Sequence, residues 1–165
     1  MNEFRVLLTI AVVICAPLPA RALCTYNGVD NVKTTVGQEF KDSKWVVKAA
    51  VVSAADHWSD VADSWVTYEI RVKHAYKGHP PERLRFFSYR DSGGFYMDRP
   101  WVGLPAGHDI GGEYLLFLDP IRSHRGRPIA AKGAVFVNYN CGQSRPWPAV
   151  PSSVRNELAA LEHAD

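Results

Sequence analysis

The chain has few of the features that indicate a function directly. Its 165 residues include 19 basic and 17 acidic side chains, and this near balance gives no general reason to expect nucleic acid or an anionic membrane surface as a partner. The six histidines form no H-x-x-x-H pair, the three cysteines form no C-x-x-C pair, and no serine lies in a nucleophile elbow. We therefore expect no metal site, no cofactor and no catalytic set of residues.

Long apolar runs are also scarce, and the one that is present lies at the N-terminus. Arg5 precedes the apolar residues 6–16, and two prolines and an A-x-A site at 20–22 follow. This order is typical of a secretory signal peptide. The run is shorter than the roughly 20 residues that a membrane-spanning helix needs. We predict a signal peptide over 1–22 and an exported mature protein, periplasmic or extracellular, without a membrane span.

The remaining residues, 23–165, have the length of one domain. A chain of this size buries roughly 68–70% of its unfolded surface in a single core. The leader contains Arg5, Arg21 and Glu3, so 17 basic and 16 acidic residues remain after its removal. No internal repeat, low-complexity tract or linker interrupts the sequence. We therefore predict one domain over 23–165.

Two cysteines remain once Cys15 is removed with the leader. Cys24 and Cys141 are an even number of thiols in an oxidising compartment, which favours a disulfide between them. Such a bond would join the first mature residues to the last predicted strand. It would close a loop of 117 residues (141 less 24) and, in the chain-entropy model, contribute roughly 4–5 kcal/mol. The alternatives are free thiols, a metal pair or a catalytic cysteine.

The mature chain is β-rich and ends in a helix. In 64–76, apolar side chains at every second position from Val66 to Val72 alternate with polar ones, which is typical of a half-buried strand. Two serines follow Pro151, and Val154, Leu158 and Leu161 recur at helical spacing, which predicts a capped amphipathic helix over 152–163. The segments predicted as strands are 44–53, 64–76, 83–89, 113–118 and 134–140.

Short motifs in these segments resemble a known family. An aromatic-Lys-Gly turn at 76–78, a Gly-Glu-Tyr-Leu strand entry at 112–115 and a cysteine near each end of 24–144 are similar to those of the netrin-like domain family. This family includes the tissue inhibitors of metalloproteinases (TIMPs) and small exported bacterial proteins. The resemblance implies a mainly β fold, a five-stranded OB-fold-like Greek-key barrel with flanking helices. It also implies a non-catalytic, protein-binding or inhibitor-like role.

One property of the inhibitors in this family depends on the N-terminal residue. In TIMPs, the α-amine and carbonyl of an N-terminal cysteine chelate the zinc of the target protease. Here Leu23 would precede Cys24 after cleavage at the predicted site. Metalloproteinase inhibition by this route would therefore need Leu23 to be removed.

In OB barrels, the loop after the first strand and the loop between the last two strands frame the usual ligand surface. Here those loops are 54–62 and 121–128, and arginines facing an aromatic ring fit an anionic glycan or an oligonucleotide. Trp101 and Trp147, in proline-framed segments, are either anchors for a protein partner or plugs of the barrel end. The candidate binding residues in the two loops are His57, Trp58, Arg122, His124, Arg125 and Arg127.

The one candidate catalytic pair is His108 with Asp109, as base and orienter of a hydrolase. No nucleophile accompanies the pair, and the glycines of 107–112 favour a tight turn. We therefore rank a protein partner first, an anionic polymer second and hydrolysis third. The oligomeric state is left open.

Overall fold

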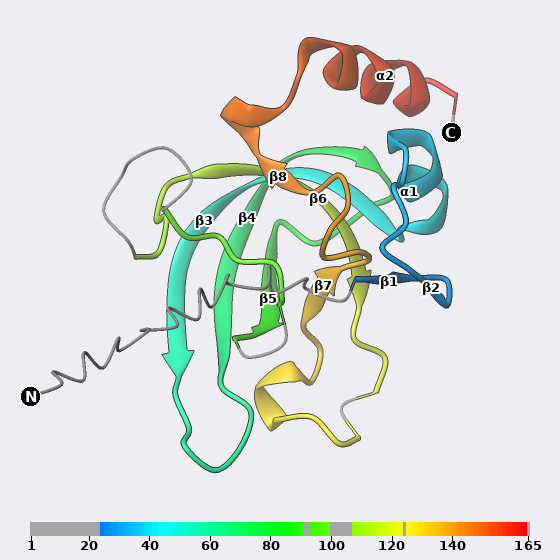
Figure 1. The fold of residues 1–165 in the computed structure, drawn as a ribbon. Coiled ribbons are helices and arrows are strands. Elements are labelled where there is room, and N and C mark those ends of the chain that lie inside the picture. The colour runs from blue at the N-terminus through cyan, green and yellow to red at the C-terminus, as the bar shows by residue number, and fades with distance from the viewer. Residues whose placement is uncertain (1–23, 91–92, 100–106, 124, 165) are drawn as a thin grey trace, which may run out of the picture.

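A computed structural model describes residues 24–90, 93–99, 107–123 and 125–164 of the chain (Figure 1). The predicted signal peptide and the candidate residues Trp101 and His124 lie outside the described residues. No helix in the described ranges is long and apolar enough to cross a membrane.

Five strands form a closed barrel. Neighbouring strands pair in the order β3-β4-β5-β7-β6, and β6 pairs again with β3, which closes the sheet. The β5–β7 pairing is parallel and the others are antiparallel. This topology confirms the predicted OB-like barrel. The barrel strands are β3 (Trp45–His57), β4 (Trp65–Lys77), β5 (Arg83–Tyr89), β6 (Glu113–Pro120) and β7 (Val135–Val137).

The predicted strand alternation is present, and β6 shows how the core is divided. Tyr114, Leu116 and Leu118 point into the barrel, where they join the main apolar cluster. Leu115 and Phe117, on the other face of the same strand, pack against the helices. Both faces of β6 are therefore buried, which explains why its sequence is a continuous apolar run.

Strand β3 is longer than the sequence indicates. The predicted connection 54–62 is wrong at its start, because the ladder with β4 continues as far as His57, which pairs with Trp65. The last strand residues, Ser53-Ala-Ala-Asp-His57, have weak strand propensity, and their pairing with the well-formed β4 outweighs it. The connection between the two strands is therefore 58–64.

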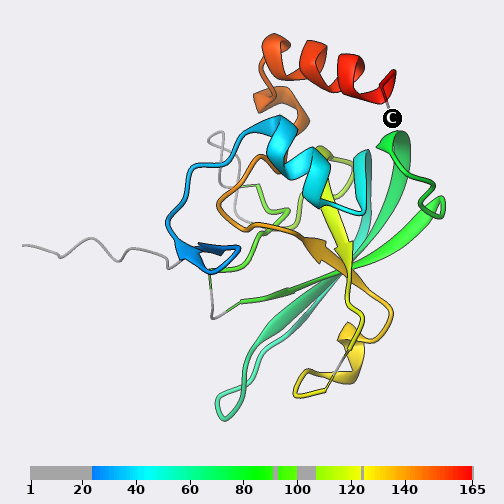
Figure 2. The same cartoon turned by 90° about the vertical axis from the view of Figure 1, so that its right-hand side faces the viewer.

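Two helices lie on the outside of the barrel at one end (Figures 1 and 2). Phe40 of α1 (Val36–Asp42) and Leu158 of α2 (Ser152–Glu162) are buried against Phe117 of β6. The predicted capping of α2 by its serines is wrong. Pro151 occupies the N-cap without a side-chain hydrogen bond, and the serines are already helical. The short elements are β1 (Thr25–Tyr26), β2 (Val29–Asp30), β8 (Arg145–Pro146), η2 (Ile129–Ala131) and η3 (Trp147–Ala149).

The first described residues are fastened to the segment after β7. Cys24 and Cys141 have a Cα–Cα distance of 6.0 Å, which suits the predicted disulfide. Tyr139 packs between them and Val32, to whose carbonyl its hydroxyl donates at 2.9 Å. The Tyr26 hydroxyl donates to Asp42 of α1 at 2.6 Å. The N-terminal segment, α1 and the chain around Cys141 therefore form one connected region.

Glu39 of α1 adds a second connection to the same region. Its side chain is fully buried (0% exposed), and its two oxygens accept the Gln143 backbone N–H at 2.9 and 3.1 Å. The Thr34 hydroxyl also donates to it. Burial raises the pKa of Glu39 above its ordinary value, although these hydrogen bonds act in the opposite direction.

Candidate functional site

Two connections project from the end of the barrel opposite α1 and α2. They are the β3–β4 connection (58–64) and the β6–β7 connection (121–134), and both lie at the lower end of the barrel in Figures 1 and 2. We refer to these two segments together as the loop end. The fold therefore brings the two candidate loops to one end of the molecule, although they are about sixty residues apart in the sequence.

Three large apolar side chains at the loop end are exposed to solvent. Trp58 is 67% exposed and Val61 is 97% exposed, both on the β3–β4 connection. Ile129, on the β6–β7 connection, is 73% exposed. Isolated exposed apolar residues are normal, but here three lie on the two loops at one end of the barrel.

The β3–β4 connection is held in shape by its own hydrogen bonds. The Ser59 hydroxyl accepts the N–H groups of Val61 at 3.3 Å and Ala62 at 3.0 Å. The Ser59 N–H donates to the Ser64 hydroxyl at 3.2 Å, which closes the turn. These local side-chain bonds fix the backbone that presents Val61 and Trp58.

The preceding residue, His57, is also held in place. It is the last residue of β3, and its ring stacks on Trp65 of β4 with centroids 3.7 Å apart. This candidate residue therefore stiffens the base of the connection.

The Arg90 guanidinium packs against the ring of Trp58. It donates to Asp98 at 2.6 Å and to Asp56 at 2.9 Å, and it lies 5.7 Å from the centre of the Trp58 ring. Tyr96 contacts the same guanidinium, at 4.8 Å. Trp58 thus packs on a cation that two carboxylates hold in position.

The electrostatics of Asp98 follow from these contacts. Burial raises the pKa of Asp98, but hydrogen bonds from Arg90 and from Tyr68, whose hydroxyl lies at 2.9 Å, outweigh it, so the pKa lies below its ordinary value. Asp98 is therefore ionised when the network is intact.

His108 belongs to this network and does not pair with Asp109. Its Nε2 lies 2.8 Å from Asp56 and its Nδ1 lies 3.2 Å from Asp98. Asp109 instead accepts from the Tyr114 hydroxyl at 3.0 Å. The expected base-and-orienter pair is therefore not formed.

The segment around His108 makes the turn that its glycines predict. Gly107 and Gly111 have φ values of 137° and 86°, in the region that favours glycine. The Gly111 N–H donates to the Val51 carbonyl at 2.8 Å, which docks this turn on β3.

The β6–β7 connection presents three arginines to solvent. Arg122, Arg125 and Arg127 are exposed, and within the described ranges none of them forms an ion pair with a carboxylate. Arg127 lies over the ring of Phe136, 5.9 Å from its centre. Since their charges are not compensated locally, these arginines are available to an anionic group.

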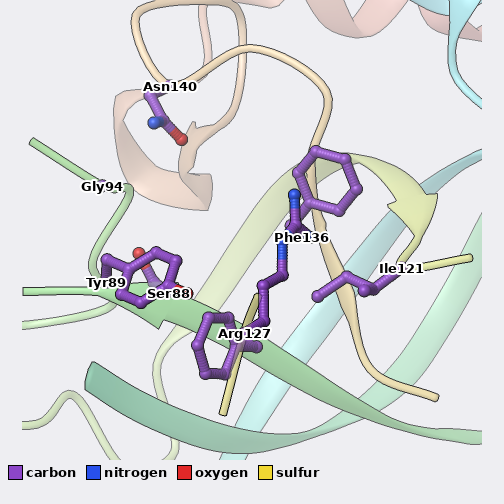
Figure 3. A pocket seen from close by; sticks show the side chains of 8 residues that line it. Ser88, Tyr89, Gly94, Ile121, Arg127, Phe136 and Asn140 are labelled. Atoms are coloured by element: carbon purple, nitrogen blue, oxygen red, sulfur yellow. The ribbon is translucent and has the colours of Figure 1, made fainter. Parts of the chain in front are cut away.

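A hollow lies beside Arg127, between β5 and the segment that follows β7 (Figure 3). Its cavity volume is about 100 Å³, and it opens to solvent. A second hollow shares Ile121, Arg127 and Phe136 with it and extends to Arg122 and Ser123. The first hollow is lined by Phe87, Ser88, Tyr89, Gly94, Ile121, Arg127, Phe136 and Asn140.

Trp147 lies apart from the loop end. It is half-buried in η3 and packs against the cluster of β6 and the helices. Lys48 and Arg155 each lie 4.7 Å from its ring centre. Trp147 therefore contributes to packing on the helix side of the barrel.

Several residues of this surface have no signal in the sequence. The network of Arg90, Asp56, Asp98 and His108 joins residues up to 52 positions apart, and no motif spacing connects them. The exposed Val61 is an ordinary loop residue by sequence. The cation–aromatic pairing of Arg127 and Phe136 depends on the way β6 turns into β7.

The fold and its surface together define a small, closed OB-like barrel with flanking helices and an apolar, basic loop end. A scan against protein-family models finds no match to the chain, and a search of curated proteins finds none either. Among the described residues, no group of three or more His, Cys, Asp or Glu side chains could hold a metal ion.

Proposed function

We propose that the protein is an exported, netrin-like binding module that holds a protein partner at the loop end of its barrel. The observation that carries this proposal is the exposure of Trp58, Val61 and Ile129 on the two connections of the loop end, one of which carries arginines that have no ion-pair partner among the described residues. The centres of protein interfaces are enriched in aromatic residues and arginine. A tryptophan that is 67% exposed is the type of side chain that carries much of the binding free energy in such interfaces.

The rigidity of the β3–β4 connection supports the same proposal. The Ser59 hydroxyl accepts two backbone hydrogen bonds within the turn, and the Arg90 guanidinium packs against the Trp58 ring. A side chain that is already in its bound position loses less conformational entropy when a partner binds. The loop end therefore has both the chemistry and the order of a binding surface.

Export is supported by the N-terminal sequence and by the cysteine pair. The pattern of residues 1–22 is that of a signal peptide, and Cys24 and Cys141 lie at a distance that suits a disulfide. Disulfides persist in oxidising compartments, so both features favour the periplasm or the cell exterior.

An anionic glycan or oligonucleotide is the second candidate ligand, and the three uncompensated arginines favour it. Binding of such a polymer releases counterions and weakens steeply with salt. The exposed apolar side chains contribute little to contacts with sulfates or phosphates, so the protein partner ranks first.

The two candidates are separated by capture experiments with matched variants. Immobilised mature protein is incubated with envelope extract, and captured proteins are quantified for the wild type, Trp58→Ala and the control Ala160→Ser on the exposed face of α2. We expect one partner to be retained by the wild type and the control, to be lost from Trp58→Ala, and to depend only mildly on salt. Salt-sensitive retention on heparin that disappears when Arg122, Arg125 and Arg127 become alanine would favour the polymer instead.

A further inference from the structure

The hollow beside Arg127 lies where the barrel sheet divides. β5 and β7 pair at a single position, Phe86 with Val135, and diverge beyond it. One wall of the hollow comes from Phe87, Ser88 and Tyr89 of β5. The other comes from Phe136 of β7 and from Ile121 and Arg127 of the β6–β7 connection (Figure 3).

Ser88 brings a hydroxyl group to this hollow. The residue is only 7% exposed overall, and no other described residue is hydrogen-bonded to its hydroxyl, which lines the open hollow. Gly94 passes directly over it, and a Cβ at position 94 would collide with the Ser88 hydroxyl and the Tyr89 carbonyl. A ligand in the hollow can therefore accept a hydrogen bond from this hydroxyl without displacing another described residue.

The other polar groups of the hollow are also donors. The Arg127 side chain runs across the opening toward Phe136 in Figure 3, and it lacks an ion pair in the described part of the chain. Asn140 contributes an exposed side-chain amide at the far rim. Among the described residues no carboxylate lines this hollow, so a guanidinium, a hydroxyl and an amide of the described lining face its open space.

The rest of the lining is apolar, and it favours an anionic group that is attached to an apolar stem. Phe87, Ile121 and Phe136 form the walls, and aliphatic carbon packs favourably on them. A sulfate or phosphate has no such stem and would leave these walls without contacts. A carboxylate on a short methylene stem matches both the hydrogen-bond donors and the apolar walls of the hollow. The guanidinium binds the carboxylate with charge-assisted hydrogen bonds.

We propose that this hollow receives an acidic side chain, glutamate or aspartate, of the protein partner. This proposal rests on the proposed function, because it names what the partner inserts beside the loop end. The carboxylate contacts Arg127 and the Ser88 hydroxyl, and its methylene stem packs against Phe87 and Ile121.

Two neutral-ended peptides test the proposal by NMR titration of labelled protein. They are acetyl-Leu-Glu-Leu-amide and acetyl-Leu-Gln-Leu-amide, which differ only in the charge of the central residue. We expect the first peptide to shift the amide signals of Ser88, Phe136 and Asn140 at millimolar concentration, and the second to bind at least about 10-fold more weakly, since a charged hydrogen bond is stronger than a neutral one.

Matched variants test whether the preference for the glutamate peptide arises in the hollow. Arg127→Gln removes the charge from the hollow and should abolish the preference for the glutamate peptide, whereas Arg125→Gln, on the same loop but outside the hollow, should leave it unchanged. Gly94→Ala should weaken binding by filling the space above Ser88, provided that its circular dichroism spectrum matches the wild type. Equal binding of both peptides, no shifts at the hollow, or a preference that persists in Arg127→Gln would overturn the proposal.

The outcome is separable from that of the proposed function. If Trp58→Ala loses the partner while Arg127→Gln changes neither partner capture nor the peptide preference, the loop end binds protein and the acidic-side-chain proposal is wrong. A heparin oligosaccharide that shifts the same signals and displaces the glutamate peptide would instead assign the hollow to an anionic polymer, and it would overturn the proposal.

Discussion

A charged side chain and several apolar side chains are buried on the helix side of this barrel, whereas at its loop end such side chains are exposed to solvent. On the helix side, the fully buried Glu39 accepts hydrogen bonds from Thr34 and Gln143, and the apolar faces of both helices are covered. At the loop end, Arg122, Arg125 and Arg127 have no ion-pair partner among the described residues, and Trp58, Val61 and Ile129 face solvent.

This difference separates stability from binding. On the helix side, Glu39 is hydrogen-bonded and the apolar helix faces are packed within the chain, so changing them should affect unfolding. Groups at the loop end are left available by the chain, so changing them should affect a ligand and leave unfolding nearly unaltered. The predictions below test this separation, from the largest expected effect to the smallest.

Loss of the cysteine pair should have the largest effect. Cys24→Ser should lower the free energy of unfolding by roughly 2–5 kcal/mol, the usual cost of removing a disulfide from a small exported domain. Urea denaturation of the mature protein measures this. Intact mass should also rise by about two hydrogens on reduction, because one bond joins two thiols. Two alkylatable thiols in unreduced, unfolded protein would contradict the disulfide.

Truncation of Trp58 should have the largest effect on binding. Trp58→Ala should weaken the affinity for the captured partner by at least about 2 kcal/mol, about 30-fold in Kd, as for an interface hot spot. Its free energy of unfolding should change by only about 0.5 kcal/mol, because the side chain is mostly exposed. Calorimetric titration and urea denaturation measure the two quantities. A large loss of stability without a loss of affinity would reverse the assignment of Trp58.

Glu39 should make stability depend on pH. Its pKa is raised in the folded state by burial, so the folded protein binds a proton more tightly than the unfolded chain. Stability should therefore fall as pH rises through the range just above the ordinary glutamate pKa of about 4.5. Unfolding in urea at several pH values compares the wild type with Glu39→Gln, which lacks this titration.

The control for this prediction is Glu157→Gln, on the exposed face of α2. It should keep the pH dependence of the wild type. If Glu39→Gln also keeps it, the carboxyl of Glu39 does not carry the effect. Glu39→Ala, which leaves the Gln143 N–H and the Thr34 hydroxyl without their acceptor, should cost about 1–3 kcal/mol at neutral pH.

Replacement of the three loop arginines should have the smallest effect on stability. Changing Arg122, Arg125 and Arg127 to alanine should alter the free energy of unfolding by less than about 0.5 kcal/mol, since none has an ion-pair partner in the described part of the chain. Urea denaturation checks this. A loss of more than about 1 kcal/mol would show that these arginines stabilise the fold.

The sequence predicts the barrel well because its strands alternate strongly. Val66, Tyr68 and Ile70 are fully buried on one face of β4, as their period of two indicates. Helix α1 is not predicted from the sequence, because its seven residues are too few to show a periodic pattern. Its start is marked mainly by the Thr35 cap, which accepts from the Gln38 N–H at 3.1 Å.

The candidate surface is less predictable than the fold. The predicted OB-like strand order placed the two candidate loops at one end of the barrel, where the structure has them, because strand order fixes which connections share an end. The sequence could not show that His108 lies between Asp56 and Asp98, because that contact depends on how the turn at 107–112 docks on β3. Nor could it separate Trp147 from the loop end, since only the packing of η3 determines its position.

Site-specific photo-crosslinking tests the central claim most directly. A photoreactive residue is placed at Val61, the most exposed apolar position of the loop end, or at Ala160, an exposed position on α2. Both variants are expressed as the full 165-residue chain and irradiated in intact cells. The account predicts a discrete crosslinked protein from position 61, absent from position 160 and lost when Trp58 is also changed to alanine. Crosslinks from position 160 alone, or equal crosslinks from both positions, would contradict it.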